Sequence, residues 1–209
     1  MIREFLLTPG PTSIPERVLR AMSVSSMHHR TDQFKRVLKS AREGMSWLAE
    51  ATEPPIFLAC SGTGAMEAAQ LNCSAEGDKI IVVNGGVFGE RFSLIAKALK
   101  REVVEILVNW GQAVTLEQIE ETLSVHADAR CFCIQYCESS TTALHPVAKA
   151  CAFVRQRWPT MLTIVDAISV FGTLPISVQA TRSDVLIVAS QKALMLPPGL
   201  SMLFLSERA

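Results

Sequence analysis

A lysine and an aspartate follow two apolar runs in the second half of the chain. Asp166 ends the run MLTIVD, and Lys192 lies in the turn after the run DVLIVAS. Both runs are typical of buried strands, so both side chains are expected at strand ends. A lysine amine can form a Schiff base with the aldehyde of pyridoxal phosphate, and a carboxylate can keep the pyridine nitrogen of that cofactor protonated. The pair fits this chemistry, although either residue alone is more simply read as a solvated lysine or a strand-end cap.

Polar residues and glycines also follow three other apolar runs. They are Ser61, Gly62 and Thr63 after the first run, Asn84 after the second, and Glu138 and Ser139 after the fourth. Ligands of open parallel sheets bind beyond the carboxyl ends of the strands. Five strand ends that carry chemically useful groups therefore predict one site at that edge of the sheet.

The segment SGTGA, residues 61–65, joins the strand IFLAC to a predicted helix. Its glycines allow the backbone to turn closely around an anion, and the free N–H groups of a helix start favour a phosphate. The segment matches neither a P-loop nor a GxGxxG motif. An ordinary turn between strand and helix, with Thr63 as the N-cap, explains the segment equally well.

Phe88 lies in the segment NGGVFG after the second predicted strand. Its ring is able to stack on a planar ligand, which contributes about 0.5–1.5 kcal/mol beyond burial. The alternative is that Phe88 is the first core residue of the next helix.

The elements that must position these residues alternate along the chain from residue 56 onward. Strands are predicted at 56–60, 80–84, 102–108, 129–136, 161–166, 184–190 and 201–206, and helices at 16–23, 32–51, 63–73, 88–99, 115–124 and 147–158. Strands separated by helices of about three turns indicate an α/β fold with a mostly parallel sheet. Residues 8–15 form a proline-rich arm that is not helical.

Composition limits the class of protein. The chain has 209 residues, of which 49% are apolar, and its mean hydropathy is +0.27, so one sizeable core with strands buried on both faces is expected. Twenty basic residues balance twenty acidic ones, so neither nucleic acid nor an anionic membrane is an expected partner. No signal peptide, transmembrane helix or metal site is expected, and the six cysteines form no CxxC pair. These features favour a reduced, cytoplasmic protein.

Seven segments carry a resemblance to a known family, and they lie within residues 6–205. In order they are LLTPGPTSIPERVLRAM, HHRTDQF, SGTGAMEAA, GDKIIVVNGGVFGERF, ESSTTALHP, VDAISVFG and SQKALMLPPGL. The chain resembles the class V aminotransferases of fold type I, in particular the alanine–glyoxylate and serine–pyruvate group. The resemblance implies a three-layer large domain that binds pyridoxal 5′-phosphate over residues 53–209, preceded by an arm and helices over 1–52.

The resemblance also implies roles for individual residues. It assigns to the cofactor Ser61, Gly62, Thr63, Phe88, Ser139, Asp166, Ile168, Gln191 and Lys192. Lys192 and Asp166 would be catalytic, and Phe88 and Ile168 would touch opposite faces of the ring. Ser139 would lie near the ring oxygen, and the other residues of the set would hold the phosphate. Free Lys192 would move the proton between the substrate Cα and the cofactor.

The chain departs from the family pattern at single positions and in length. Thr142, His28 and Ala189 stand where the family has glycines. Family members are nearly twice as long, and their carboxy-terminal small domain, absent from this sequence, carries the arginine that binds the substrate carboxylate. Arg30 or Arg91 could replace that arginine, although each is more simply a surface or structural ion-pair residue.

Two functions follow from these observations. The first is transamination from a small amino acid, alanine or serine, to glyoxylate or pyruvate, and family members imply a homodimer. The second is a truncated, catalytically impaired domain that serves as a cofactor-binding or interaction subunit. A cysteine desulfurase is less favoured, because its catalytic cysteine would lie beyond residue 209.

Overall fold

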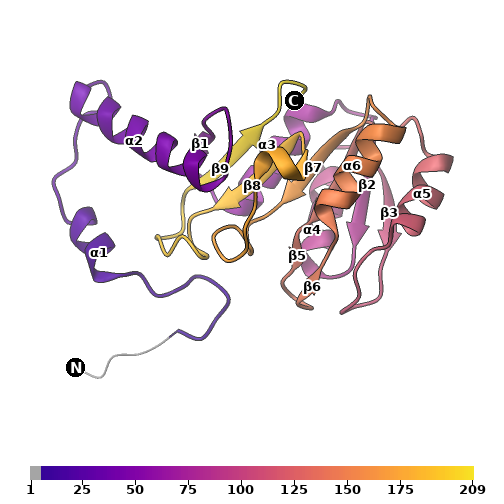
Figure 1. Cartoon of the computed structure of the whole chain (residues 1–209), viewed down its shortest axis with the longest axis horizontal. Coiled ribbons are helices and arrows are strands. Elements are labelled where there is room, and N and C mark those ends of the chain that lie inside the picture. Colours follow the sequence, from indigo (N-terminus) through magenta and orange to yellow (C-terminus); the bar gives the residue numbers. More distant parts are fainter. Residues whose placement is uncertain (1–5) are drawn as a thin grey trace.

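A seven-stranded sheet forms the centre of the computed structural model, which describes residues 6–209 (Figure 1). Its strands are β1 (Ile56–Leu58), β2 (Lys79–Asn84), β3 (Glu102–Leu107), β4 (Cys131–Gln135), β7 (Leu162–Asp166), β8 (Val185–Ala189) and β9 (Ser201–Leu205). The strand order is β1-β9-β8-β7-β4-β2-β3. All neighbouring strands from β8 to β3 are parallel, whereas β9 is antiparallel to both β8 and β1.

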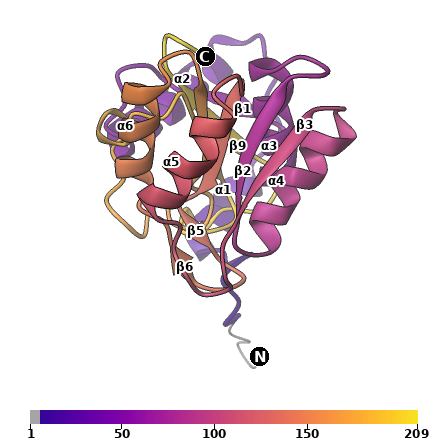
Figure 2. The ribbon, with the colours of Figure 1, turned by 90° about the vertical axis from the view of Figure 1, so that its right-hand side faces the viewer.

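Helices cover both faces of this sheet. They are α3 (Gly62–Cys73), α4 (Val87–Ala98), α5 (Leu116–Val125) and α6 (Val147–Arg157), preceded by α1 (Glu16–Met22) and α2 (Asp32–Leu48). Figure 2 shows α5 and α6 on one side of the strands and α3 and α4 on the other. The three-layer α/β architecture expected from the sequence is therefore confirmed, and the ends of the predicted elements differ from the observed ones by at most three residues.

The layering follows from the alternation of side chains along the strands. In β2, Ile80 and Val82 pack in the apolar cluster that includes α3 and α4, whereas Ile81 and Val83 pack in the cluster that includes α5 and α6. Successive residues of a strand point to opposite faces, so an unbroken apolar run fills both clusters at once. This explains the high apolar content of the chain.

Three short elements were not expected from the sequence. They are β5 (Cys137–Glu138), β6 (Ala143–Leu144) and α7 (Val178–Thr181). Elements of two to four residues are too short to show a hydrophobic period. Thr142, which replaces a family glycine, lies in the turn between β5 and β6 with a φ of 60°. This left-handed conformation costs an L-residue about 1–2 kcal/mol, which explains why glycine suits the position.

The amino-terminal helices lie along one end of the molecule (Figure 1). Thr31 caps α2 by accepting a hydrogen bond from the N–H of Phe34. Neither α1 nor α2 contains a buried residue, and Val37 and Trp47 of α2 remain 53% and 82% exposed. Among residues 6–209, no helix combines the length and the apolar character that spanning a membrane requires.

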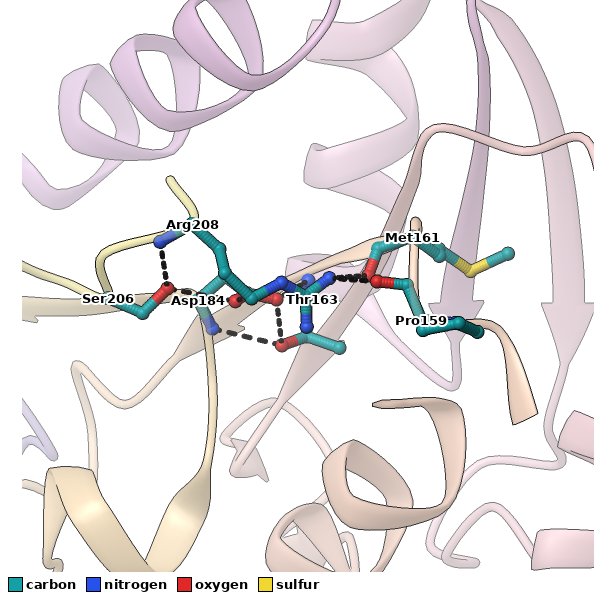
Figure 3. Close-up of polar contacts among 6 residues, drawn as sticks. All are labelled: Pro159, Met161, Thr163, Asp184, Ser206 and Arg208. Atoms are coloured by element: carbon teal, nitrogen blue, oxygen red, sulfur yellow. Dashed lines mark hydrogen bonds and ion pairs between the residues drawn. The ribbon is translucent and has the colours of Figure 1, made fainter. Parts of the chain in front are cut away.

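A polar network joins three strands at the end of the sheet where β7 and β8 begin (Figure 3). The buried Asp184 carboxylate accepts hydrogen bonds from the N–H and hydroxyl of Thr163, at 2.9 and 3.1 Å, and from the hydroxyl of Ser206 at 2.9 Å. Arg208 pairs with this carboxylate at 3.6 Å and donates to two backbone carbonyls, those of Pro159 and Met161. Asp184 therefore ties the segment after β9 to the centre of the sheet.

Replacing Asp184 with alanine is expected to lower the free energy of unfolding by about 3 kcal/mol, because the Arg208 guanidinium and the Thr163 N–H lose a buried acceptor. Asp184→Asn keeps one acceptor oxygen and should lose less. Chemical denaturation followed by circular dichroism measures both changes. Equal stability of Asp184→Ala and the unmodified chain would show that the network contributes nothing.

Candidate active site

A cavity of about 260 Å³ lies at the carboxyl ends of β7 and β8. It is lined by Ser61, Gly62, Thr63, Met66, Phe88, Arg91, Asp166, Ile168, Ser169, Gln191 and Lys192. Eight of the nine residues that the sequence assigns to the cofactor are in this set. The ninth, Ser139, lies just outside, and its hydroxyl is hydrogen-bonded to that of Ser169. A larger cavity, about 790 Å³, lies beside Trp47 and Tyr136 and includes none of the predicted residues.

The start of α3 forms one wall of the cavity. Ser61 is the N-cap, because its hydroxyl accepts the N–H of Gly64 at 3.3 Å, so the reading of Thr63 as the N-cap is wrong. A Cβ on Gly62 would lie 2.4 Å from the Cδ1 of Ile168, so any larger residue would push the Ile168 side chain aside. The helix start thus brings free N–H groups, which favour anions, next to the other lining residues.

The start of α4 forms a second wall. Phe88 is half-buried and belongs to neither apolar cluster of the core, whereas Phe92 of the same helix is fully buried. The alternative reading of Phe88 as a core residue is therefore wrong. The Arg91 guanidinium lies 4.9 Å from the centre of the Phe88 ring, and it donates a hydrogen bond to the Thr63 hydroxyl at 3.2 Å.

Arg91 and Arg30 occupy different environments. Arg91 lines the cavity and forms no ion pair within the described part of the chain, so it is not a surface ion-pair residue. Arg30 is exposed in the segment between α1 and α2 and does not line the cavity. Asn84, also expected at this edge, instead donates a hydrogen bond to Glu105 on β3 at 3.3 Å.

Asp166 is buried at the end of β7. One of its carboxylate oxygens, Oδ1, accepts the N–H of Ile168 at 2.8 Å. Burial raises the pKa of Asp166 to about 6, and the negative charge of Glu138 acts in the same direction. The Ile168 hydrogen bond, Lys192 and Arg91 oppose this rise. A cationic group placed beside a carboxyl with a raised pKa favours its charged form.

Lys192 is half-buried and lines the same cavity. Burial lowers the pKa of its amine, and Arg91 lowers it further, whereas Asp166 acts in the opposite direction. Its Nζ forms neither a hydrogen bond nor an ion pair with any residue of the 6–209 range. A lysine with a lowered pKa has more of the neutral amine, which is the nucleophilic form.

The proline-rich arm contacts Lys192, which sequence reasoning missed. The N–H of Thr12 donates to the carbonyl of Gln191 at 3.1 Å, and the Thr12 hydroxyl donates to the carbonyl of Lys192 at 2.9 Å. A Cβ on Gly10 would lie 2.4 Å from the Cδ of Lys192. The glycine between Pro9 and Pro11 was the available signal, because such a position often marks close approach of the backbone.

Replacing Gly10 with alanine is expected to displace the Lys192 side chain, since the added Cβ would lie 2.4 Å from its Cδ, and to lower stability, because L-residues rarely adopt the φ of +158° found at Gly10. Covalent capture of a pyridoxal compound by Lys192 should slow by about tenfold, because misplacement of a reacting group by about 1 Å carries a large cost in rate. Stopped-flow absorption measures this rate, and Gly44→Ala, at an open position of α2, is the matched control. Equal rates for Gly10→Ala and the unmodified chain would exclude control of Lys192 by the arm.

The chain matches a known protein family over nearly its whole length. The family model described as Aminotransferase class-V matches residues 4–209. An uncharacterized aminotransferase of Helicobacter pylori (strain ATCC 700392 / 26695) is 39% identical over 98% of this chain and 54% of its own length. The serine–glyoxylate aminotransferase of Methylorubrum extorquens is 34% identical over 99% of this chain and 52% of its own length.

A solved structure of another aminotransferase has the same fold. The alanine–glyoxylate aminotransferase of Nostoc sp. superimposes with a TM-score of 0.93 and 29% identity, over 100% of this chain and 55% of that one. The chain therefore spans about half the length of the curated relatives it matches. A match over nearly every residue, together with the same fold, shows that the chain belongs to the class V aminotransferase family.

Proposed function

We propose that residues 53–209 form the cofactor-binding domain of a pyridoxal 5′-phosphate-dependent aminotransferase. The proposed reaction moves an amino group from a small amino acid, alanine or serine, to glyoxylate or pyruvate. The observation that carries this proposal is the presence of Lys192 and Asp166 in one cavity with a helix start. The names of the Methylorubrum and Nostoc relatives support the choice of donor and acceptor.

The residues of the cavity fit the cofactor. The second carboxylate oxygen of Asp166, Oδ2, accepts no hydrogen bond from the described residues, so it is available to a protonated ring nitrogen. The Lys192 amine is likewise unpaired. Ser61, Gly62 and Thr63 would hold the phosphate at the start of α3, as expected for an anion at a helix N-terminus.

Each residue then has a defined action. When bound, pyridoxal phosphate supplies an electron-withdrawing ring beside the substrate Cα. Lys192 would attach the cofactor through its amine and, after substrate has displaced it, would remove the proton from Cα and deliver it to the cofactor. Asp166 would keep the ring nitrogen protonated, and Phe88 and Ile168 would contact the ring faces. Ser139 would act near the ring oxygen through Ser169.

Arg91 favours the second candidate function, a cofactor-binding or interaction domain with impaired turnover. It is the only arginine among the cavity residues, and its guanidinium already contacts Thr63 and Phe88. A substrate carboxylate would then need a guanidinium from outside residues 53–209. On this proposal the chain binds cofactor but transaminates slowly.

Titration of the purified chain with pyridoxal phosphate, followed by visible absorption, distinguishes these functions. The aminotransferase proposal expects a visible band that borohydride removes, that alanine or serine bleaches, and that glyoxylate or pyruvate restores. Cofactor binding without a response to amino acid would support the second function. Absence of any bound cofactor would contradict both the aminotransferase and a cofactor-binding domain.

We also propose that the protein is a homodimer. Leu19, Met22 and Val24 in and after α1 are 51–66% exposed, and Val37 and Trp47 of α2 are exposed as well. Several exposed apolar side chains on two consecutive helices are typical of a surface that another chain covers. Light scattering should give twice the 22.8 kDa mass of the chain. A monomer at micromolar concentration would contradict the proposal.

A further inference from the structure

A buried carboxylate outside the cavity contacts the helix that carries Phe88. Glu138 ends β5 and is 0% exposed. Its Oε2 accepts the N–H groups of Phe88 and Gly89 at 3.0 and 2.9 Å. Its Oε1 accepts the N–H and the hydroxyl of Ser140 at 3.2 and 2.6 Å. Both oxygens of this carboxylate are thus occupied, and half of its hydrogen bonds hold the first turn of α4.

The first turn of α4 depends on these contacts because its own N-cap provides none. Gly86 stands at the N-cap and has no side chain to accept a helix N–H. The N–H of Val87 donates instead to the Ser140 hydroxyl at 3.0 Å. The first three N–H groups of α4 are therefore satisfied by two side chains of the β5–β6 hairpin. A negative charge at this end of the helix is also favoured by the helix dipole.

The backbone is built to allow this close contact. A Cβ on Gly86 would lie 2.5 Å from the Ser140 hydroxyl oxygen and 2.7 Å from the Glu138 Cγ and Cδ. Only glycine allows the loop before α4 to reach the carboxylate. The position of Phe88, one residue into the helix from Val87, is consequently fixed by the hairpin rather than by packing of its ring in the core.

We propose that Glu138 is a positioning residue for the cofactor ring: it anchors the start of α4 so that Phe88 presents its ring to the cavity. This inference rests on the proposed function, in which Phe88 stacks on pyridoxal phosphate. Glu138 does not line the cavity, so its hydrogen bonds act on the cofactor through Phe88, whereas its charge acts on Asp166. The N–H groups of Phe88 and Gly89 would lose their acceptor without it, and the first turn of α4 would loosen.

A double-mutant cycle on the 209-residue chain tests the proposal, with the dissociation constant of pyridoxal phosphate measured by equilibrium dialysis. Glu138→Ala should weaken binding by about three- to tenfold, the range that loss of an aromatic stack would give. In a Phe88→Ala background the same substitution should change binding by less than about twofold, because the ring through which it acts is gone. Glu138→Gln keeps one acceptor oxygen for Phe88 and Gly89, so it should fold and should weaken binding less.

Asp184→Ala is the matched control, because it also removes a buried carboxylate with several hydrogen bonds, but at the opposite end of the sheet. It should lower the unfolding midpoint and leave the dissociation constant unchanged. Hydrogen exchange provides a readout without cofactor: the amides of Val87, Phe88 and Gly89 should exchange faster in both Glu138 variants, and at the unmodified rate in Asp184→Ala.

Three results would overturn the inference while leaving the proposed function intact. They are unchanged cofactor affinity in Glu138→Gln and Glu138→Ala, an equal effect of Glu138→Ala with and without Phe88, and an equal loss of affinity in Asp184→Ala. If Glu138→Ala fails to fold, Glu138→Gln alone decides, through its affinity and the exchange of the three amides. Failure of the unmodified chain to bind pyridoxal phosphate would instead reject the proposed function, and the inference with it.

Discussion

Lys192→Ala is expected to abolish covalent attachment of pyridoxal phosphate and to leave the α/β fold intact. Lys192 is the lysine that lines the cavity, and the hydrogen bond from the Thr12 hydroxyl goes to its backbone carbonyl, which the substitution keeps. Loss of an acid–base group typically lowers a rate by about 10²–10⁴-fold, so any transamination should fall by at least that factor. Visible absorption and far-ultraviolet circular dichroism measure the two effects.

Lys149→Ala is the matched control for this variant. Lys149 is an exposed lysine of α6, on the face of the sheet that does not carry the start of α3, and it does not line the cavity. The control should keep the visible band and the full rate. A visible band that survives in Lys192→Ala would place the cofactor on another side chain.

Asp166→Asn is expected to have opposite effects on activity and on stability. An asparagine no longer supplies the negative charge that keeps the ring nitrogen protonated, so a half-reaction with amino acid should slow by about two orders of magnitude or more. The cofactor should remain bound, because Lys192 still attaches it. Rapid-mixing absorption with alanine or serine measures the rate.

The stability of the cofactor-free chain should change in the other direction. The pKa of Asp166 is about 6 in the folded chain, above its ordinary value of 3.8. Because this pKa is raised, its contribution to stability is fully present below about pH 4 and is lost as the pH rises through 6. The difference corresponds to about 3 kcal/mol, an order-of-magnitude figure. Above pH 6, the Asp166→Asn chain should therefore unfold at a higher denaturant concentration than the unmodified chain. Near pH 4, the two chains should unfold at similar denaturant concentrations.

Denaturation of both chains at a series of pH values tests this expectation. A difference in stability that does not grow between pH 4 and pH 6 would show that Asp166 is not held with a raised pKa. An unchanged half-reaction rate would remove Asp166 from the mechanism. The combination of slower chemistry and greater stability is what a buried catalytic charge should show.

The sequence was sufficient for the fold and for most of the candidate site. Apolar runs of strand length, separated by helices of about three turns, specify a parallel sheet, and a parallel sheet brings its carboxyl ends to one edge. Lys192 and Asp166 could be found because each directly follows such a run. The sequence left two roles open for Phe88, because helical periodicity does not distinguish a core residue from a cavity-lining residue at the start of a helix.

The missed features depend on contacts between residues far apart in the chain. Glu138 meets the N–H of Phe88 across 50 residues, and Thr12 meets the carbonyl of Lys192 across 180 residues. Neither contact follows the periodicity of a helix or a strand, so no local sequence pattern predicts it. The glycines at positions 10 and 86 were visible, but which side chains approach them is decided only by the folded structure.

Mapping the site of cofactor attachment tests the central claim most directly. The purified chain is mixed with pyridoxal phosphate, reduced with borohydride, digested, and analysed by mass spectrometry. We expect one modified peptide, containing Lys192, and no modification of the same chain when it carries Lys192→Ala. Reduced cofactor on Lys79 or Lys149, or on no lysine at all, would contradict the assignment of this cavity as a pyridoxal phosphate site.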